Sequence, residues 1–437
     1  MRTSIFKLFG LGVALALFAM AAGHSGQIGL AQVSCTVTVS AGSPIQAAID
    51  AASAGAVICV EAGSYSENLT INKKQDLTLQ GAGRDDVTLD GSAGVADQKP
   101  AILIQDSKKI TIKGFKIVKS RRGVHAIDTT GLVLADNSFK NNLRQGILLQ
   151  RAEATLTGNL IQDTQPDRDG ARGQGVNAID SQAVLKDNTI SGSAEIAIVV
   201  AGGSDQSGST VTISKNTITD NALAGIGVSN NSTATIDGNT ITRNVEEGIF
   251  VGQSAHAQIT NNQITESKPN PKGENCCGFG INLRFNAQAT IQGNTISQNT
   301  DVAILVLESA QATIRQNTIV NNRSVGVLVV NNARATIQNN TIDGNLIHGI
   351  LLGYIERLAD SVEATIINNR IKGHRPGPSG EGQAIAIFSS SRATMRDNIL
   401  SDNLVGVSIY QQAQATITSN TILNNTLAGL SRLLPIW

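Results

Sequence analysis

Three charged residues near the middle of the sequence are of the types that cleave glycosidic bonds: Arg284, Glu308 and Glu247. Glycosidase and lyase chemistry requires two acidic groups, or a base beside a neutralising cation, held a few ångströms apart. The three residues fall near one another when the chain is laid out as repeating strands. We take them as candidate catalytic residues on condition that their side chains converge in one groove.

Three long insertions hold much of the remaining charge. They separate Asn159 from Gly175, Asn262 from Gly280 and Asn369 from Ala386, where the ordinary gap is nine residues. Loops carried on a rigid scaffold are where binding residues concentrate. We expect these loops either to be solvated surface loops or to flank a groove for an elongated ligand. Under the second interpretation, the candidate substrate-binding residues are Asp167, Arg172, Lys272, Asn282, His374 and Arg375.

The composition argues against binding that is driven by bulk charge. The chain has 34 basic and 34 acidic residues, and only 16% of its residues are charged. A neutral chain sets up no net field that attracts nucleic acid or an anionic membrane. The sequence shows no Cys/His spacing typical of zinc and no Asp-rich calcium loop. We therefore expect no nucleic-acid partner, no metal and no cofactor.

The first 31 residues have the pattern of an export signal. Arg2 and Lys7 accompany an apolar run from Leu8 to Met20, and small residues follow it. The run is too short for a stable span, and no later segment reaches the ~18 apolar residues that a span needs. Cleavage near Gly23 and cleavage near Ala31 both fit. We expect a mature chain that is secreted or periplasmic and has no membrane span.

The four cysteines are consistent with an oxidising compartment. Cys35 and Cys59 lie in two β-like runs on either side of a helical segment, so a disulfide between them would staple that segment. Cys276 and Cys277 are adjacent. They could form a vicinal disulfide, pair with another chain or stay reduced.

The strongest signal in the sequence is internal self-similarity. A motif close to A-T-I-x-x-N-T-I recurs, and six of its eleven spacings are 22 or 23 residues. A Thr stands four residues before most of the motif Asn residues, a second Asn five after, and a Gly or Ala nine after. The motif Asn positions are 137, 159, 188, 216, 239, 262, 294, 317, 340, 369, 398 and 420.

Each repeat contains three short alternating apolar runs, and alternation indicates strands. A single repeat of this size cannot bury an apolar face, whereas stacked repeats share one core. The sequence therefore predicts an all-β fold, a right-handed parallel β-helix with three-stranded coils and about 12–14 turns. We expect the Asn residues to hold left-handed corner conformations and to stack as amide ladders, not to catalyse.

Residues 43–52 have the pattern of an amphipathic helix with Ser43 as its N-cap. Such a helix would cover the N-terminal end of the solenoid, where bare strand edges otherwise invite aggregation. The expected organisation is a signal peptide (1–31), an N-terminal cap (35–62), the β-helix (63–430) and a C-terminal tail (431–437).

The segment from Val39 to Gly91, which includes S-P-I-Q-A-A-I-D-A-A, resembles the N-terminal cap of the pectin-lyase-like superfamily. The N-T-I repeats resemble those of the right-handed β-helix repeat family. The resemblance implies a fold and leaves the activity open, since the superfamily includes lyases, hydrolases, esterases, epimerases and non-enzymatic surface proteins. The W-x-D-H and R-x-P-x-x-R strings of lyases and the D-P-H-D string of alginate epimerases are absent.

These observations favour an exported β-helix protein that binds polysaccharide or acts at the cell surface, with no assured catalytic site. The expected partner is a polysaccharide or a cell-surface glycan. The main alternative is a divergent polysaccharide lyase or glycoside hydrolase, which requires Arg284, Glu308 and Glu247 to converge. A second alternative resembles the NosD-type periplasmic accessory proteins linked to copper-enzyme maturation, although the Cys and His residues offer no coordination set.

Overall fold

The structure is a computed structural model that describes residues 34–433, except 169, 171, 204–206, 272–277, 355–360, 375–380 and 411. The expected signal peptide lies outside the described residues. Lys272, Arg375, Cys276 and Cys277 lie outside them as well. From Cys35 onward the chain forms one compact unit.

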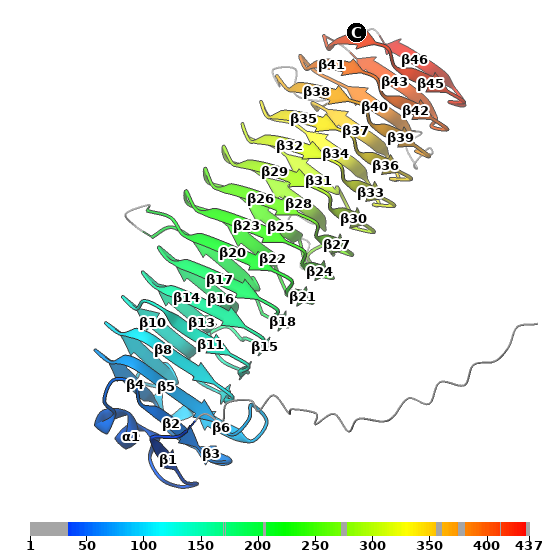
Figure 1. Cartoon of the computed structure of the whole chain (residues 1–437). Helices are drawn as coiled ribbons and strands as arrows, with labels where there is room; N and C mark the ends of the chain where they lie inside the picture. The colour runs from blue at the N-terminus through cyan, green and yellow to red at the C-terminus, as the bar shows by residue number, and fades with distance from the viewer. Residues whose placement is uncertain are drawn as a thin grey trace, which may run out of the picture. The chain divides into compact units, whose positions relative to one another are not determined.

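That unit consists of three parallel sheets, of 16, 15 and 15 strands, to which the coils contribute strands in turn (Figure 1). Sheet A contains β1 Val37–Val39, β2 Val57–Val60, β5 Gln75–Gly81, β8 Lys108–Lys113, β11 Leu132–Ala135, β14 Glu153–Thr157, β17 Gln182–Lys186, β20 Thr210–Ser214, β23 Thr233–Asp237, β26 His256–Thr260, β29 Gln288–Gln292, β32 Gln311–Arg315, β35 Arg334–Gln338, β38 Glu363–Ile367, β41 Arg392–Arg396 and β44 Gln414–Thr418. Sheet B contains β3 Gly63–Tyr65, β6 Val87–Asp90, β9 Lys116–Val118, β12 Ser138–Lys140, β15 Leu160–Gln162, β18 Thr189–Ser191, β21 Thr217–Thr219, β24 Thr240–Thr242, β27 Gln263–Thr265, β30 Thr295–Ser297, β33 Thr318–Val320, β36 Thr341–Asp343, β39 Arg370–Lys372, β42 Ile399–Ser401 and β45 Thr421–Leu423. Sheet C contains β4 Leu69–Asn72, β7 Ile102–Gln105, β10 Arg122–Ile127, β13 Gln145–Gln150, β16 Gln174–Ile179, β19 Ile198–Ala201, β22 Ala224–Val228, β25 Glu247–Val251, β28 Phe279–Leu283, β31 Ile304–Val306, β34 Val325–Val329, β37 His348–Leu352, β40 Gln383–Ile387, β43 Val405–Tyr410 and β46 Ala428–Leu433.

The expected right-handed β-helix is confirmed, with about 15 coils instead of the expected 12–14. The extra coils precede Asn137, the first motif Asn. In those coils other residues occupy the position of the motif Asn, as Phe115 does. The last strand, β46, runs to Leu433 and so includes the start of the expected tail.

The N-terminal end carries one α-helix, α1 (Ile45–Ala51), which buries Ile45 and Ile49. Its first turn is capped from outside the helix, because the carboxylate of Glu67 accepts hydrogen bonds from the backbone N–H groups of Ile45 and Gln46 at 2.8 and 3.1 Å. The N-cap position is Pro44 and not Ser43 as expected, and because Pro44 makes no side-chain capping bond, Glu67 supplies the acceptors. Cys35 and Cys59 form a disulfide beside this cap, with Cα atoms 5.7 Å apart.

One continuous core of Ile, Val, Leu and Ala runs through the coils. At its corners the Asn ladders form as expected. The side-chain amide of Asn216 donates to Asn239 Oδ1 at 3.0 Å, and that of Asn239 donates to Asn262 Oδ1 at 2.9 Å. Each amide also satisfies a strand carbonyl of the preceding coil, as Asn239 does with Ile213. The ladder Asn residues are therefore structural.

The expectation that these Asn residues adopt the left-handed backbone conformation was wrong. The residue directly before each one does so, for example Lys215 before Asn216 at φ 55° and Gln316 before Asn317 at φ 56°. The Asn side chain must point inward to reach the next amide, so the sharp turn is made one position earlier. Gly takes that position in other coils, as at Gly238, where φ is 64°.

Candidate functional site

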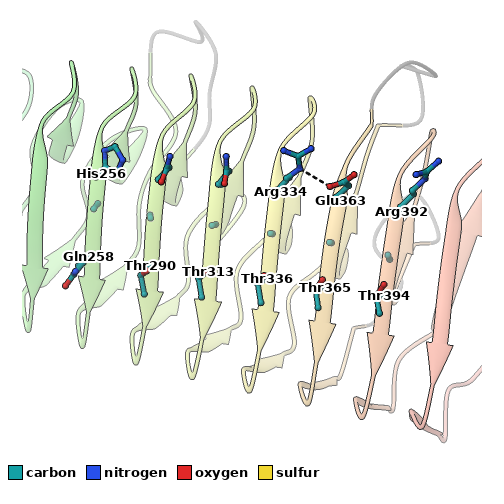
Figure 2. Close-up of a pocket in the computed structure, with 18 of the residues that line it drawn as sticks. His256, Gln258, Thr290, Thr313, Arg334, Thr336, Glu363, Thr365, Arg392 and Thr394 are labelled. Carbon is teal, nitrogen blue, oxygen red and sulfur yellow. Dashed lines mark hydrogen bonds and ion pairs between the residues drawn. The ribbon is translucent and has the colours of Figure 1, made fainter. Parts of the chain in front are cut away.

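A groove of about 1000 Å³ runs along the outer face of sheet A, across the last eight strands from β23 to β44. Strands of successive coils are about 4.8 Å apart, so seven steps give a length of roughly 34 Å. Two parallel rows of polar side chains line it, as Figure 2 shows. The groove is therefore long, shallow and shaped for an extended ligand.

The strand-start row consists of the first residue of each of the eight strands, which are Thr233, His256, Gln288, Gln311, Arg334, Glu363, Arg392 and Gln414. The threonine row lies two residues further along, at Gln258, Thr290, Thr313, Thr336, Thr365, Thr394 and Thr416. Parallel pairing in register stacks both rows, since Gln311 pairs with Arg334 and Thr313 with Thr336.

The alanine row separates the two polar rows, at positions 257, 289, 312, 335, 364, 393 and 415. Successive side chains of a strand point to opposite faces of the sheet, so these alanines point inward, and six of them belong to the main core. The strip between the two polar rows is therefore formed by backbone. In the early coils the threonine row is broken by Val133 and Val184. It is continuous from Thr290 to Thr416 along the last six strands, where the groove lies.

The hydroxyls of Thr290, Thr313 and Thr336 form no hydrogen bond with another described residue. Each hydroxyl is thus able both to donate and to accept a bond from a ligand. The charges in the groove are few and mixed: Arg334 Nε lies 2.8 Å from Glu363 Oε2, and Arg392 stands on the next strand. The site suits a hydroxyl-rich ligand with little charge.

The long insertions do not flank this groove. They connect sheet B to sheet C, whereas the groove covers sheet A. The last insertion also ends two residues earlier than expected, because Gln383 pairs with His348 and Ala384 takes the Gly position. The run Ala384-Ile385-Ala386-Ile387 alternates so evenly that both registers fit the sequence.

The outer face of sheet C is apolar and covered by protein. Leu305 and Leu328 are 5% and 8% exposed and pack with Val302 and Val325 in a second apolar cluster outside the main core. Val302 comes shortly before β31 and Val325 is the first residue of β34, so residues near the starts of these strands help to cover the face.

The candidate catalytic residues lie at this covered face, outside the groove. Arg284 Nε is 3.4 Å from Glu308 Oε2. Asn282 donates to Glu247 Oε1 at 2.6 Å. Burial raises the pKa of Glu247 to about 7, while the bond from Asn282 and the charge of Arg284 oppose that rise. Two of the three residues are thus in contact, and the third is within electrostatic reach of Arg284.

The candidate substrate-binding residues have different environments. Asp167 is 8% exposed and pairs with Arg121 and Arg144, and Arg172 is exposed near them. Asn282 is 2% exposed and is engaged with Glu247. None of these three lines the groove.

His374 is fully buried and takes the place of an Asn in the second ladder. Its backbone N–H donates to Asn403 Oδ1 at 3.1 Å, and its Nδ1 lies 2.9 Å from the carbonyl of Asn345. A residue inside the coil does not reach a surface ligand, so we withdraw His374 as a substrate-binding residue.

Two tripeptides known from polygalacturonases do occur in the chain, N-T-D at 299–301 and R-I-K at 370–372. Asn299 is a fully buried ladder residue, and Arg370–Lys372 is strand β39, three coils further along sheet B. The tripeptides therefore belong to the repeat and do not form a shared site.

Among the described residues, no three His, Cys, Asp or Glu side chains come together as metal ligands. In the same part of the chain, no helix is long and apolar enough to cross a membrane.

Comparison with known proteins supports the fold over most of the chain. Residues 56–209, 204–356 and 355–431 match the model of a family described as right handed beta helix region. A cell surface glycoprotein of Methanothermus fervidus is 32% identical over 124 residues, which are 28% of this chain and 20% of that protein. The chain thus spans about a fifth of the length of this relative.

Among solved structures, the periplasmic alginate epimerase AlgG superimposes with a TM-score of 0.51 at 12% identity, covering 77% of this chain and 83% of that one. The catalytic unit of an alpha-1,3-glucanase from Streptomyces thermodiastaticus matches with a TM-score of 0.38 at 16% identity, covering 88% and 65%. The epimerase likeness concerns the fold alone.

The groove was missed in the sequence, although its threonine row was visible as a Thr four residues before most motif Asn residues. Reading the polar residue two positions before these Thr residues as well would have indicated two parallel polar rows on the outer face of one sheet.

Proposed function

Since the chain belongs to the right-handed β-helix family, with a rigid stack of coils as its body, we propose that it binds an extended polysaccharide in the groove of sheet A. The observation that carries the proposal is the continuous threonine row with free hydroxyls, repeated once per coil. An extended polysaccharide is itself a linear repeat of hydroxyl groups, so it can make the same hydrogen bond at successive coils.

The chemistry of the groove narrows the ligand class. Hydrogen bonds to neutral groups contribute little singly, at about 0.5–1.5 kcal/mol each, so affinity must come from many coils acting together. Arg334 is neutralised by Glu363, which leaves Arg392 and His256 as the remaining cationic or titratable members of the strand-start row. The preferred ligand is a long glycan with few charges.

The proposed location is outside the cytoplasm, at or near a cell surface. The Cys35–Cys59 disulfide supports an oxidising compartment. The partial relative in Methanothermus fervidus is named a cell surface glycoprotein, which is consistent with the same setting.

Affinity electrophoresis against a panel of neutral and acidic polysaccharides tests the proposal. We expect at least one neutral or weakly charged polysaccharide to retard the protein. The variant Thr336→Arg should lose that retardation, because a long cation then occupies the groove. The matched variant Thr155→Arg changes the same row on β14, outside the groove, and should behave as wild type. Retardation by none of the polysaccharides would refute the proposal.

A second candidate function is cleavage of a glycan at the outer face of sheet C. The pKa of Glu247, about 7, suits a proton donor or acceptor near neutral pH. Its test is the release of reducing or unsaturated ends from the bound polysaccharide. We expect Glu247→Gln to abolish such a release if this function exists, and no release by wild type would rule it out.

A further inference from the structure

Four arginines surround one carboxylate at the corner between sheets B and C, in the coils of β10, β13 and β16. Asp167 Oδ2 accepts a hydrogen bond from Arg144 Nη1 at 2.6 Å and lies 3.4 Å from Arg121 Nη2. The side chains of Asp167, Arg121 and Arg144 are only 5%, 12% and 21% exposed. This arginine cluster also includes Arg122 and Arg172.

The positive charges outnumber the negative one. Burial and the charges of Arg121, Arg144 and Arg172 together lower the pKa of Arg122 to about 10, while Asp167 opposes them. At neutral pH the four described guanidinium groups remain charged. One carboxylate neutralises one of them, so the described residues leave a surplus of about three positive charges in a half-buried place.

The cluster also contains a guanidinium donor that has no hydrogen-bond partner. Arg121 Nη1 donates to Gln98 Oε1 and Arg122 Nε donates to Gln145 Oε1, whereas the buried Nε of Arg144 has no hydrogen-bond partner. The carboxylate of Glu195 bonds with Gln174 and not with the arginines. Buried donors and surplus charge are both satisfied by an anion whose oxygens accept several bonds at once.

We propose that the arginine cluster is a binding site for an oxoanion, a phosphate, sulfate or carboxylate group, separate from the groove of sheet A. The guanidinium groups of Arg121 and Arg144 meet at Asp167 from successive coils, and the charges of Arg122 and Arg172 are close by. This arrangement favours a compact group with two or more accepting oxygens. The site goes beyond the proposed glycan binding, since it lies on a different corner and takes a charged group.

Isothermal titration of the full chain with sodium phosphate, sodium sulfate and sodium glucuronate tests the site, with sodium chloride at equal ionic strength as the reference. We expect at least one of the three anions to bind with a stoichiometry of about one. Phosphate or sulfate binding would indicate a tetrahedral anion, and glucuronate binding alone would indicate a sugar carboxylate. Binding of none of the three beyond chloride would overturn the proposal.

Two variants locate the site. The Arg172→Gln variant should fold normally, because Arg172 is exposed. The Arg122→Gln variant keeps a donor for Gln145. Each variant should bind the anion at least fivefold more weakly than wild type. Arg151→Gln is the control with the same charge change, because Arg151 is exposed and pairs with Asp128. If Arg151→Gln weakened anion binding as much as the other two variants, bulk charge would explain the weakening, and the proposed site would be refuted. Thr336→Arg should leave anion binding unchanged, so the site and the groove can fail independently.

Discussion

The outer faces of sheets A and C are built from the same repeat, yet one is open and uniform and the other is covered and varied. On the outer face of sheet A the side chains recur coil after coil as a row of Thr and a row of other polar residues. On sheet C the corresponding column changes from Phe250 to Asn282, Leu305 and Leu328, and most of it is buried. The comparison teaches that a repeated row indicates a surface for a repeated ligand, whereas varied positions serve local packing and local charge.

The largest difference should appear when the same substitution is placed on the two faces. Leu305→Arg would insert a cation into the apolar cluster of sheet C and should destabilise the fold by about 4 kcal/mol or more. Thr313→Arg, on the open face of sheet A, should change the free energy of unfolding by no more than about 0.5 kcal/mol. Urea unfolding of both variants measures this. Equal losses would show that the two faces are equally covered.

The next effect concerns Glu247 and pH. Its pKa rises from 4.5 to about 7 on folding. The folded state therefore holds the proton more tightly, and the stabilisation present below pH 4.5 is lost as the pH rises through 7. Glu247→Gln cannot ionise, so at pH 8 it should be more stable than wild type by about 1–3 kcal/mol. At pH 4 the two proteins should unfold alike; a pH-independent difference would contradict the assignment.

A smaller effect is expected from removing hydroxyls without changing shape. Replacing Thr313 and Thr336 together by Val should weaken polysaccharide binding about five- to thirtyfold, because two hydrogen bonds are lost at about 0.5–1 kcal/mol each. Thr155→Val with Thr212→Val, in the same row before the groove, is the matched control. Unchanged affinity in the groove variant would mean that the hydroxyls do not contact the ligand.

The smallest effect should come from the ion pair in the groove. Arg334 and Glu363 are more than half exposed, at 63% and 53%, and such pairs contribute about 0–1 kcal/mol. Arg334→Gln should therefore leave the melting temperature within a degree or two of wild type. A large loss of stability, measured by differential scanning calorimetry, would show that the groove wall depends on this pair.

The fold was predictable because the information for it is local and repeated. The motif Asn residues, the Thr before them and the apolar alternation all recur along the chain, and each coil contacts mainly its neighbours. The Asn ladders followed from that pattern. In the coil before the first motif Asn, Phe115 takes the ladder position, and its backbone N–H donates to Asn137 Oδ1 at 3.1 Å.

The sites were less predictable because they depend on contacts that no repeat encodes. Arg121 and Asp167 are 46 residues apart, and their meeting depends on how an insertion folds back over two coils. His374 was expected in a loop because it lies within the insertion between Asn369 and Ala386, yet the ladder register places it inside. Whether a face is open, as on sheet A, or covered, as on sheet C, follows from the packing of distant segments.

The central claim is that the threonine row binds a linear glycan coil by coil, and the dependence of affinity on ligand length tests it most directly. Oligosaccharides of increasing length, derived from a polysaccharide that binds, should be titrated against wild type and Thr336→Arg. In wild type the affinity should rise with each added sugar and level off near seven residues, when the roughly 34 Å groove is filled. An affinity that does not change with length, or that Thr336→Arg leaves intact, would contradict the account.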